Sequence, residues 1–209
     1  MIGVIYTIGY TGFTVEEFIS TLKKYEINVV IDVRSSPYSE RYADYNRDNI
    51  ESVLSENGIY YRNYAKEFGA RQDNRAFYAE EGFLDFEKFA KSEQFLFGVE
   101  KIKNSVAKGY KIVFLCAEKD PIQCHRTILV ARTFHELGYK VVHLLPNNDK
   151  KTHAEIINIL LSKYDSNFRQ CKMFSDNQKS NEEYMEEHIV EAYRKQNKKI
   201  GYRKDEEEL

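Results

Sequence analysis

The segment 114–126, FLCAEKDPIQCHR, begins with apolar residues. Thiol, carboxyl, imidazole and guanidinium groups come directly after them. Enzymes use the first three kinds of group as nucleophiles, acids and bases. The candidates for these roles are Cys116, Glu118, Cys124 and His125. Arg126 comes at the expected start of a helix, where a guanidinium and free backbone N–H groups together would hold an anion. The segment therefore predicts a polar site at a turn between a strand and a helix.

The spacing of this segment disfavours two kinds of thiol site. The C-x5-R pattern of thiol phosphatases is absent, because the residue six positions after Cys116 is Ile122. C-x7-C-H is not a zinc-finger spacing, and no C-x-x-C pair accompanies it, so no metal ligands are predicted. A plainer alternative stays open, in which both cysteines are small hydrophobic residues of the core or of a loop.

The segment 32–37, DVRSSP, places a charged pair at the end of an apolar stretch. Asp32 and Arg34 are two residues apart, so in a strand they point to the same face. Either they pair with each other, or Arg34 presents its planar fork to a phosphate or carboxylate while Asp32 orients it or acts as a base. Ser35 and Ser39 are further candidates for binding the same ligand.

The segment 7–12, TIGYTG, has the glycine-containing turn that often precedes an anion-binding helix start. It lacks both G-x-G-x-x-G and G-x-x-x-x-G-K, so it is neither a dinucleotide fingerprint nor a P-loop. Gly9 and Tyr10 are candidate ligand-binding residues, with a tight turn as the alternative role of Gly9.

Hydrophobic patterns and turn residues indicate that strands and helices alternate along the chain. The expected strands are 2–10, 27–34, 59–64, 110–117 and 139–145. The expected helices are 14–25, 47–58, 85–109 (as one helix or two), 124–138 and 152–164. We therefore predict an α/β fold of three layers: a mostly parallel sheet of about five strands with helices on both faces. The carboxyl ends of such strands meet at one edge, which brings the candidate groups together.

The chain changes character near residue 165, where apolar residues thin out and charged residues dominate. We predict an α/β domain over 1–164 and a charged C-terminal extension over 165–209, partly helical or disordered. A helix is expected over 181–199. Two roles are open for it: a peripheral extension, or a helix that binds a partner or forms a homo-oligomer.

The composition of the chain argues against nucleic-acid-binding and membrane proteins. The chain has 31 basic and 33 acidic residues, so it lacks the basic footprint of a nucleic-acid-binding protein. The loop 60–78 interleaves tyrosines with arginines, which would suit a nucleotide or a single strand, but a loop that buries its own rings is favoured. An odd number of cysteines, no signal peptide and no long apolar run predict a cytoplasmic protein without a membrane partner. Nothing in the sequence identifies a cofactor.

Five ordered motifs carry a resemblance to a known family: TIGYTG, IDVRSSPYS, NGIYY, LCAEKDPIQCHR and GYKVVHL. Over roughly residues 5–145 the chain resembles the domain of unknown function 488 family. The resemblance implies a compact cytosolic α/β domain, common in prokaryotes, without an established activity. It marks as motif positions Gly9, Tyr10, Asp32, Arg34, Pro37, Ser39, Cys116, Glu118, Cys124, His125 and Arg126. FGA at 68–70 departs from the family's frequent LGG, and the C-terminal extension lies outside the family pattern.

The leading hypothesis is an enzyme-like crevice for an anionic small molecule or nucleotide at the carboxyl edge of the sheet. In it Arg34 and Arg126 bind the anion, His125 is the acid or base, and a cysteine is an optional nucleophile. The alternatives are a non-catalytic module that binds nucleotides or nucleic acid, and a structural or interaction protein whose polar cluster only fixes the strand ends.

Overall fold

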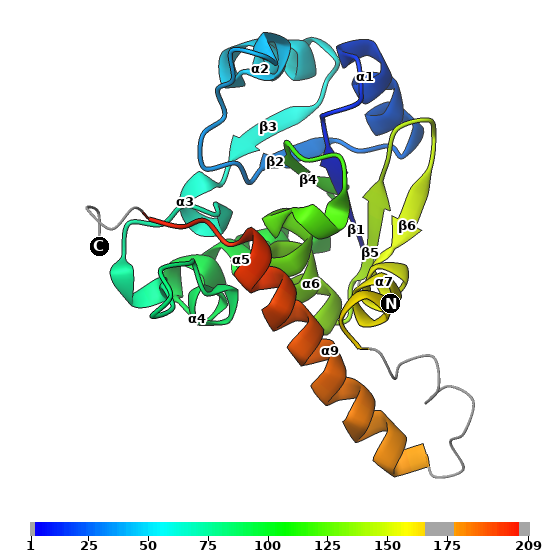
Figure 1. Ribbon diagram of the computed structural model, residues 1–209. Coiled ribbons are helices and arrows are strands. Elements are labelled where there is room, and N and C mark those ends of the chain that lie inside the picture. The colour runs from blue at the N-terminus through cyan, green and yellow to red at the C-terminus, as the bar shows by residue number, and fades with distance from the viewer. Residues whose placement is uncertain (1–2, 166–177, 205–209) are drawn as a thin grey trace.

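A computed structural model describes residues 3–165 and 178–204 of the chain (Figure 1). Its centre is a six-stranded sheet with the order β3-β2-β4-β1-β5-β6. The strands are β1 (Val4–Gly9), β2 (Val29–Asp32), β3 (Tyr60–Asn63), β4 (Ile112–Cys116), β5 (Lys140–Leu144) and β6 (Lys150–Thr152). The first five strands pair in parallel, and β6 pairs antiparallel with β5. The prediction of a mostly parallel sheet is confirmed, with β6 as an additional strand.

Helices cover both faces of the sheet, which confirms the three-layer α/β fold. They are α1 (Val15–Lys24), α2 (Arg47–Glu56), α3 (Ala65–Phe68), α4 (Phe86–Ala90), α5 (Glu93–Ala107), α6 (Arg132–Glu136), α7 (His153–Tyr164) and α9 (Gln178–Ile200). Helices α1 and α2 pack on one face, where Phe18, Leu22 and Ile50 are buried. The others pack on the opposite face, where Phe68 and Phe134 belong to the larger core cluster (Figure 1).

The predicted start of the first helix is confirmed in detail. The Glu17 backbone N–H donates to Thr14 Oγ1 at 3.2 Å, and the Thr14 backbone N–H donates to Glu17 Oε2 at 2.9 Å. This capping box satisfies two backbone donors that a helix start leaves without partners. The segment 85–109 forms two helices, because Ser92 breaks α4 from α5 and caps the second one.

The segment 124–138 differs from the regular amphipathic helix that its pattern predicts. A 3-10 turn, η3 (Pro121–Gln123), precedes it, and the helix opens with a π-helical stretch, η4 (Arg126–Ala131), before α6. Every residue of η4 is buried. π-helical turns are rare and often occur at functional sites, and this one directly follows Cys124 and His125.

The last helix of the described chain, α9, packs on α7 and on the turn that carries η3 and η4. In α9 the side chains of Tyr193, Gln196 and Asn197 are buried. Asn197 accepts from the Phe86 backbone N–H and donates to the Leu84 carbonyl, so its amide joins α9 to the start of α4. Residues 166–177 and the acidic end, 205–209, lie outside the described residues. No helix within the described part of the chain is long and apolar enough to cross a membrane.

Candidate functional site

The candidate residues meet where three neighbouring strands end. Gly9 in β1 is in register with Cys116 in β4, and Asp32 in β2 is in register with Leu115 in β4. The chain leaves β1 toward β2 through α1, and leaves β4 toward β5 through η4 and α6 on the other face. Strands β1 and β4 therefore flank a topological switch point, the place where open α/β sheets bind ligands.

A pocket of about 260 Å³ opens at this edge. Its lining includes seven of the predicted site residues: Tyr10, Arg34, Ser35, Cys116, Glu118, Cys124 and His125. Four other predicted residues do not line it: Gly9, Asp32, Ser39 and Arg126. The sequence thus identified much of the pocket, and the four remaining residues have other contacts.

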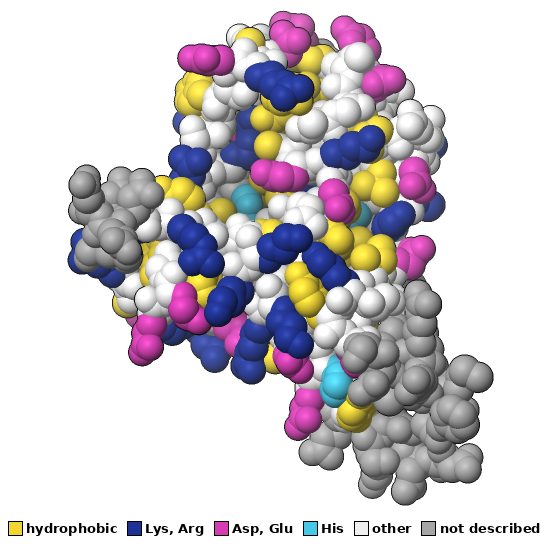
Figure 2. All heavy atoms as spheres, viewed as in Figure 1, with side chains coloured by type: hydrophobic (Ala, Val, Ile, Leu, Met, Phe, Trp, Pro, Cys, Tyr) yellow, Lys and Arg dark blue, Asp and Glu magenta, His cyan; other side chains and the backbone are white. Residues whose placement is uncertain are grey.

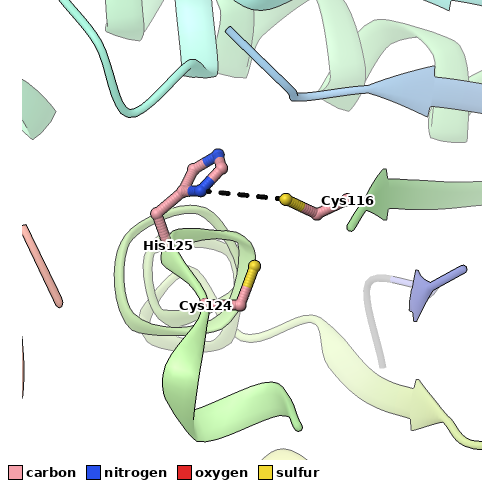
Figure 3. A group of neighbouring side chains, drawn as sticks. All are labelled: Cys116, Cys124 and His125. Atoms are coloured by element: carbon pink, nitrogen blue, oxygen red, sulfur yellow. Dashed lines mark hydrogen bonds between the residues drawn. The ribbon is translucent and has the colours of Figure 1, made fainter. Parts of the chain in front are cut away.

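Two thiols, a carboxylate and an imidazole form the floor of the pocket. Cys116 Sγ and Cys124 Sγ both donate to Glu118 Oε2, at 3.2 Å and 3.0 Å. Cys116 Sγ lies 3.9 Å from His125 Nδ1. Cys116 comes from the end of β4, whereas Cys124 and His125 come from the turn into η4, and the three side chains converge (Figure 3).

The orientation of the imidazole is fixed by the neighbouring strand. His125 Nε2 lies 2.9 Å from the backbone carbonyl of Val33, and a carbonyl only accepts, so Nε2 carries a proton. In the neutral ring, Nδ1 is then the acceptor and faces Cys116. Burial lowers the pKa of His125, but hydrogen bonding and charge from Cys124 and the charge of Glu118 outweigh it and raise the pKa.

The surroundings of the two thiols shift their pKa values in opposite directions. Burial tends to raise the pKa of Cys124, but the hydrogen bond from Cys116 and the charges of Arg126 and His125 bring that pKa well below its ordinary value. The pKa of the Cys116 thiol is raised by its hydrogen bond with Cys124 and by burial. Burial also raises the pKa of Glu118, with the charge of Cys124 adding to the effect. Two thiols whose pKa values are shifted in opposite directions, next to a carboxyl group and an imidazole, are suited to nucleophilic or acid–base chemistry.

Arg34 and Asp32 form a buried ion pair on the other side of the pocket. Arg34 Nε donates to Asp32 Oδ1 at 2.9 Å, and Arg34 Nη2 lies 2.5 Å from Asp32 Oδ2. Arg34 Nη1 donates to the Tyr45 carbonyl, and Tyr61 Oη donates to Asp32 Oδ2 at 2.7 Å. The ring of Tyr10 lies under the guanidinium, with the centroid 5.2 Å from Cζ. Arg34 therefore reaches the pocket with most of its donors already used.

Arg126 points into the protein. Its side chain is fully buried, and Nη1 donates to the Glu118 carbonyl at 2.6 Å. Among the described residues, its Nε has no hydrogen-bond partner and no carboxylate forms a salt bridge with it. Gly9 is required beside it, because a Cβ there would lie 1.8 Å from the Glu118 carbonyl oxygen. The two residues hold the loop that carries Glu118.

The two serines differ in their positions. Ser35 Oγ accepts from the Arg71 backbone N–H at 2.8 Å and lines the pocket. Ser39 lies farther along the same loop, where its backbone N–H donates to Asn46 Oδ1 at 2.6 Å. The hydroxyl of Ser35 therefore joins the β2 loop to the loop that carries Arg71.

Seven lining residues were not singled out by the sequence: Ser36, Ala70, Arg71, Ala117, Gln123, Ile200 and Tyr202. Arg71 is exposed, its guanidinium lies 4.9 Å from the ring centroid of Tyr202, and no described acidic side chain pairs with it. The interleaved aromatics and arginines of 60–78 were a signal for Arg71. Tyr202 carried no such signal, because it reaches the pocket only through the packing of α9.

The segment 60–78 buries three of its six aromatic rings and leaves only that of Tyr60 exposed. Tyr61, Phe68 and Tyr78 are buried, and Phe68 packs edge-on against Phe95 and Phe114 of the core. Figure 2 shows basic side chains interspersed with acidic ones over the visible face. The described face therefore lacks the row of exposed rings on which the bases of a single strand stack.

A protein-family model matches the chain. The family model described as "Domain of unknown function DUF488" matches residues 14–133, which include β2, β3, β4 and the Cys124–His125 turn. No curated protein and no solved structure matches the chain. The matched span covers more than half of the chain. The chain belongs to the DUF488 family of domains of unknown function.

Proposed function

We propose that the protein is an enzyme that binds an anionic small molecule or nucleotide in the pocket at the carboxyl edge of the sheet. One observation carries the proposal. The buried side chains of Cys116, Cys124 and His125, together with the exposed Glu118, line a pocket that also carries the cation of Arg71. Perturbed titratable groups in a concave site at a topological switch point are the usual setting of catalysis.

Different residues of the pocket would bind the ligand and carry out the chemistry. Among the described residues no acidic side chain pairs with Arg71, and its guanidinium lies over the ring of Tyr202, so its planar fork is available to a phosphate or carboxylate. Arg34 also lines the pocket and adds positive charge, held in place by Asp32. A ligand anchored by its anionic group between these arginines would place its remaining atoms over the thiols and His125.

The proposed chemistry uses groups with different tasks. The thiolate of the pair is the candidate nucleophile, His125 Nδ1 is the acid or base next to Cys116, and Glu118 exchanges protons with both thiols. Arg126 supports the negative charge on the sulfurs from behind. In this respect the role of Arg126 differs from the predicted anion ligand, since it acts through the cluster rather than on the ligand.

A ligand screen tests the proposal. Thermal shift of the full-length protein is measured with nucleoside monophosphates and with small phosphorylated or carboxylated metabolites, and hits are confirmed by calorimetry. We expect at least one saturable ligand whose binding weakens in Arg71→Ala and persists in Arg62→Ala, an exposed arginine outside the pocket. Equal binding to both variants would contradict the proposed site.

A further inference from the structure

The cysteines and the histidine on the pocket floor have the geometry of metal ligands. No two of their ligand atoms lie more than 4.8 Å apart, and all three residues are buried. With metal–sulfur bonds of about 2.3 Å and metal–nitrogen bonds of about 2.0–2.1 Å, a tetrahedral ion separates sulfur from nitrogen by about 3.6 Å. The observed separation between Cys116 Sγ and His125 Nδ1 is 3.9 Å.

We propose that Cys116, Cys124 and His125 bind a divalent transition-metal ion, with zinc as the best fit, and leave one coordination position open to the pocket. Thiolate and imidazole ligands together select zinc among the available divalent ions. Three protein ligands and one open position are the pattern of catalytic zinc sites, whereas structural sites use four. All three residues line the pocket, so a water molecule or a ligand atom can reach the fourth position.

The hydrogen bond made by the other ring nitrogen of His125 supports the proposed metal site. Histidines that bind metals usually donate their other ring N–H to a carboxylate or a carbonyl, which fixes the tautomer. His125 makes such a bond from Nε2 to the Val33 carbonyl at 2.9 Å, so Nδ1 presents a lone pair to the sulfurs. This contact is independent of the cysteine positions, because it comes from the end of β2.

The charges around the three proposed ligands are consistent with a bound metal ion. Arg126 is a buried cation without a carboxylate partner among the described side chains, so it favours negative charge beside it. A divalent ion with two thiolates is neutral, and the remaining negative charge of Glu118 then balances Arg126. With the ion bound, the two sulfurs and His125 Nδ1 would be ligands in place of the nucleophile and acid–base roles given above, and Glu118 would stay beside both sulfurs.

The spacing C-x7-C-H did not predict this site. Zinc-finger spacings describe ligands carried by one short loop or hairpin, whereas here one ligand ends a strand and two begin a helix after the η3 turn. The ligands meet because β4 leads into η4 through a turn that is held by Arg126 and packed against Gly9.

Cobalt binding tests the site without any knowledge of the substrate. The full-length protein is prepared metal-free under reducing conditions in a Cys171→Ser background, since Cys171 lies outside the described residues. Co²⁺ is then titrated, and absorbance is read in the near-ultraviolet and visible regions. We expect one equivalent to give thiolate-to-cobalt charge transfer and strong visible bands of a tetrahedral site, both displaced by Zn²⁺.

Variants assign the ligands. Cys116→Ser and Cys124→Ser should lose the charge-transfer band or reduce it by half, and His125→Asn should weaken Co²⁺ binding at least about tenfold. His188→Asn is the matched control, because that histidine pairs with Asp165 away from the pocket. Circular dichroism verifies that each variant folds. A band that is unchanged in folded cysteine variants would overturn the assignment.

A measurement on the unsubstituted chain avoids dependence on the variants. Zn²⁺ should protect Cys116 and Cys124 from alkylation, as read by peptide mass spectrometry, and a chelator should remove the protection. Cys171 should react equally in both conditions. Absence of protection, or of any cobalt band, would overturn the metal site and leave the anion-binding proposal standing, because the ligand screen is read at Arg71.

Discussion

His125 donates a hydrogen bond of 2.9 Å from Nε2 to the backbone carbonyl of Val33. The bond ties the turn after β4 to the end of β2, two parts of the chain that are far apart in sequence. It also sets the direction of Nδ1, which is the atom that faces the thiols. The chemistry proposed for the pocket depends on this relationship, because a flipped ring would present a donor at the wrong place.

Removal of the Arg71 guanidinium should lower the affinity for an anionic ligand with little effect on the stability of the fold. Arg71→Ala deletes a charge-assisted contact of about 1.5–3 kcal/mol, so the affinity for an anionic ligand should fall by about tenfold to a hundredfold. Calorimetry against the best ligand from the screen measures it. Arg62→Ala should bind as the natural chain does, and an equal loss in the two variants would argue for a diffuse charge effect.

Addition of one methyl group at Gly9 should disrupt the site. The new Cβ would meet the Glu118 carbonyl oxygen at 1.8 Å, so the loop that carries Glu118 must move. We expect Gly9→Ala to lower the free energy of unfolding by about 3 kcal/mol and to abolish ligand binding.

Gly58 provides the comparison for this substitution. It has φ of +71° with nothing within 4 Å of the added Cβ, so Gly58→Ala carries only backbone strain of about 1–2 kcal/mol. Urea unfolding compares the two variants. Intact binding in Gly9→Ala would show that the loop position is not required.

Loss of the buried carboxylate should cost much of the stability of the fold. Asp32→Asn leaves the buried guanidinium of Arg34 without its counter-charge, and breaking such a pair typically costs about 3–5 kcal/mol. Tyr61→Phe removes only a hydrogen bond to the same carboxylate and should cost about 1 kcal/mol. Chemical denaturation measures both, and similar small losses would mean that the pair contributes little.

Acid should weaken the packing of α9 through a buried chain of histidines. Thr7, His143, His153 and Tyr193 are joined in sequence by hydrogen bonds of 2.8, 3.0 and 2.8 Å. Burial, with the charges of neighbouring basic groups, lowers the pKa of His153 to about 3, and burial also places the pKa of His143 well below its ordinary value. The folded protein therefore holds both rings neutral.

The sign of the pH dependence follows from these lowered pKa values. The unfolded chain takes up protons at these histidines near pH 6.5, whereas the folded chain resists protonation until a much lower pH. Their contribution is thus complete above about pH 6.5 and is lost toward pH 3, by about 1.4 kcal/mol per pH unit for each histidine. Urea unfolding measures the free energy of unfolding at pH values from 7 to 5. This free energy should fall less steeply with decreasing pH in His153→Gln than in His188→Asn. Equal slopes would contradict this account.

Local sequence signals predicted most strands and helices, because each signal reflects a specific physical requirement of the backbone. Thr14 and Glu17 satisfy the same helix start that their spacing predicted, and Gly58 follows α2 with a positive φ. The charged strand β6 was not predicted, because three residues with no apolar alternation carry no strand signal. It forms because β5 leaves an edge to which β6 can pair.

The site was predictable where residues sit at strand ends and unpredictable where packing decides. Cys116 and Arg34 reach the pocket because parallel strands end together. The inward direction of Arg126 depends on the π-helical turn, and Tyr202 reaches the pocket through the packing of α9 on distant parts of the chain. Neither contact has a local sequence signal, since both arise between segments far apart in sequence.

A crystal structure of the full-length protein with its best anionic ligand tests the central claim most directly. The account predicts that the anionic group lies within hydrogen-bonding distance of the Arg71 guanidinium and that the rest of the ligand faces Cys116 and His125. A ligand bound elsewhere at full occupancy, with the pocket between Arg71 and Cys116 free of it, would contradict the account.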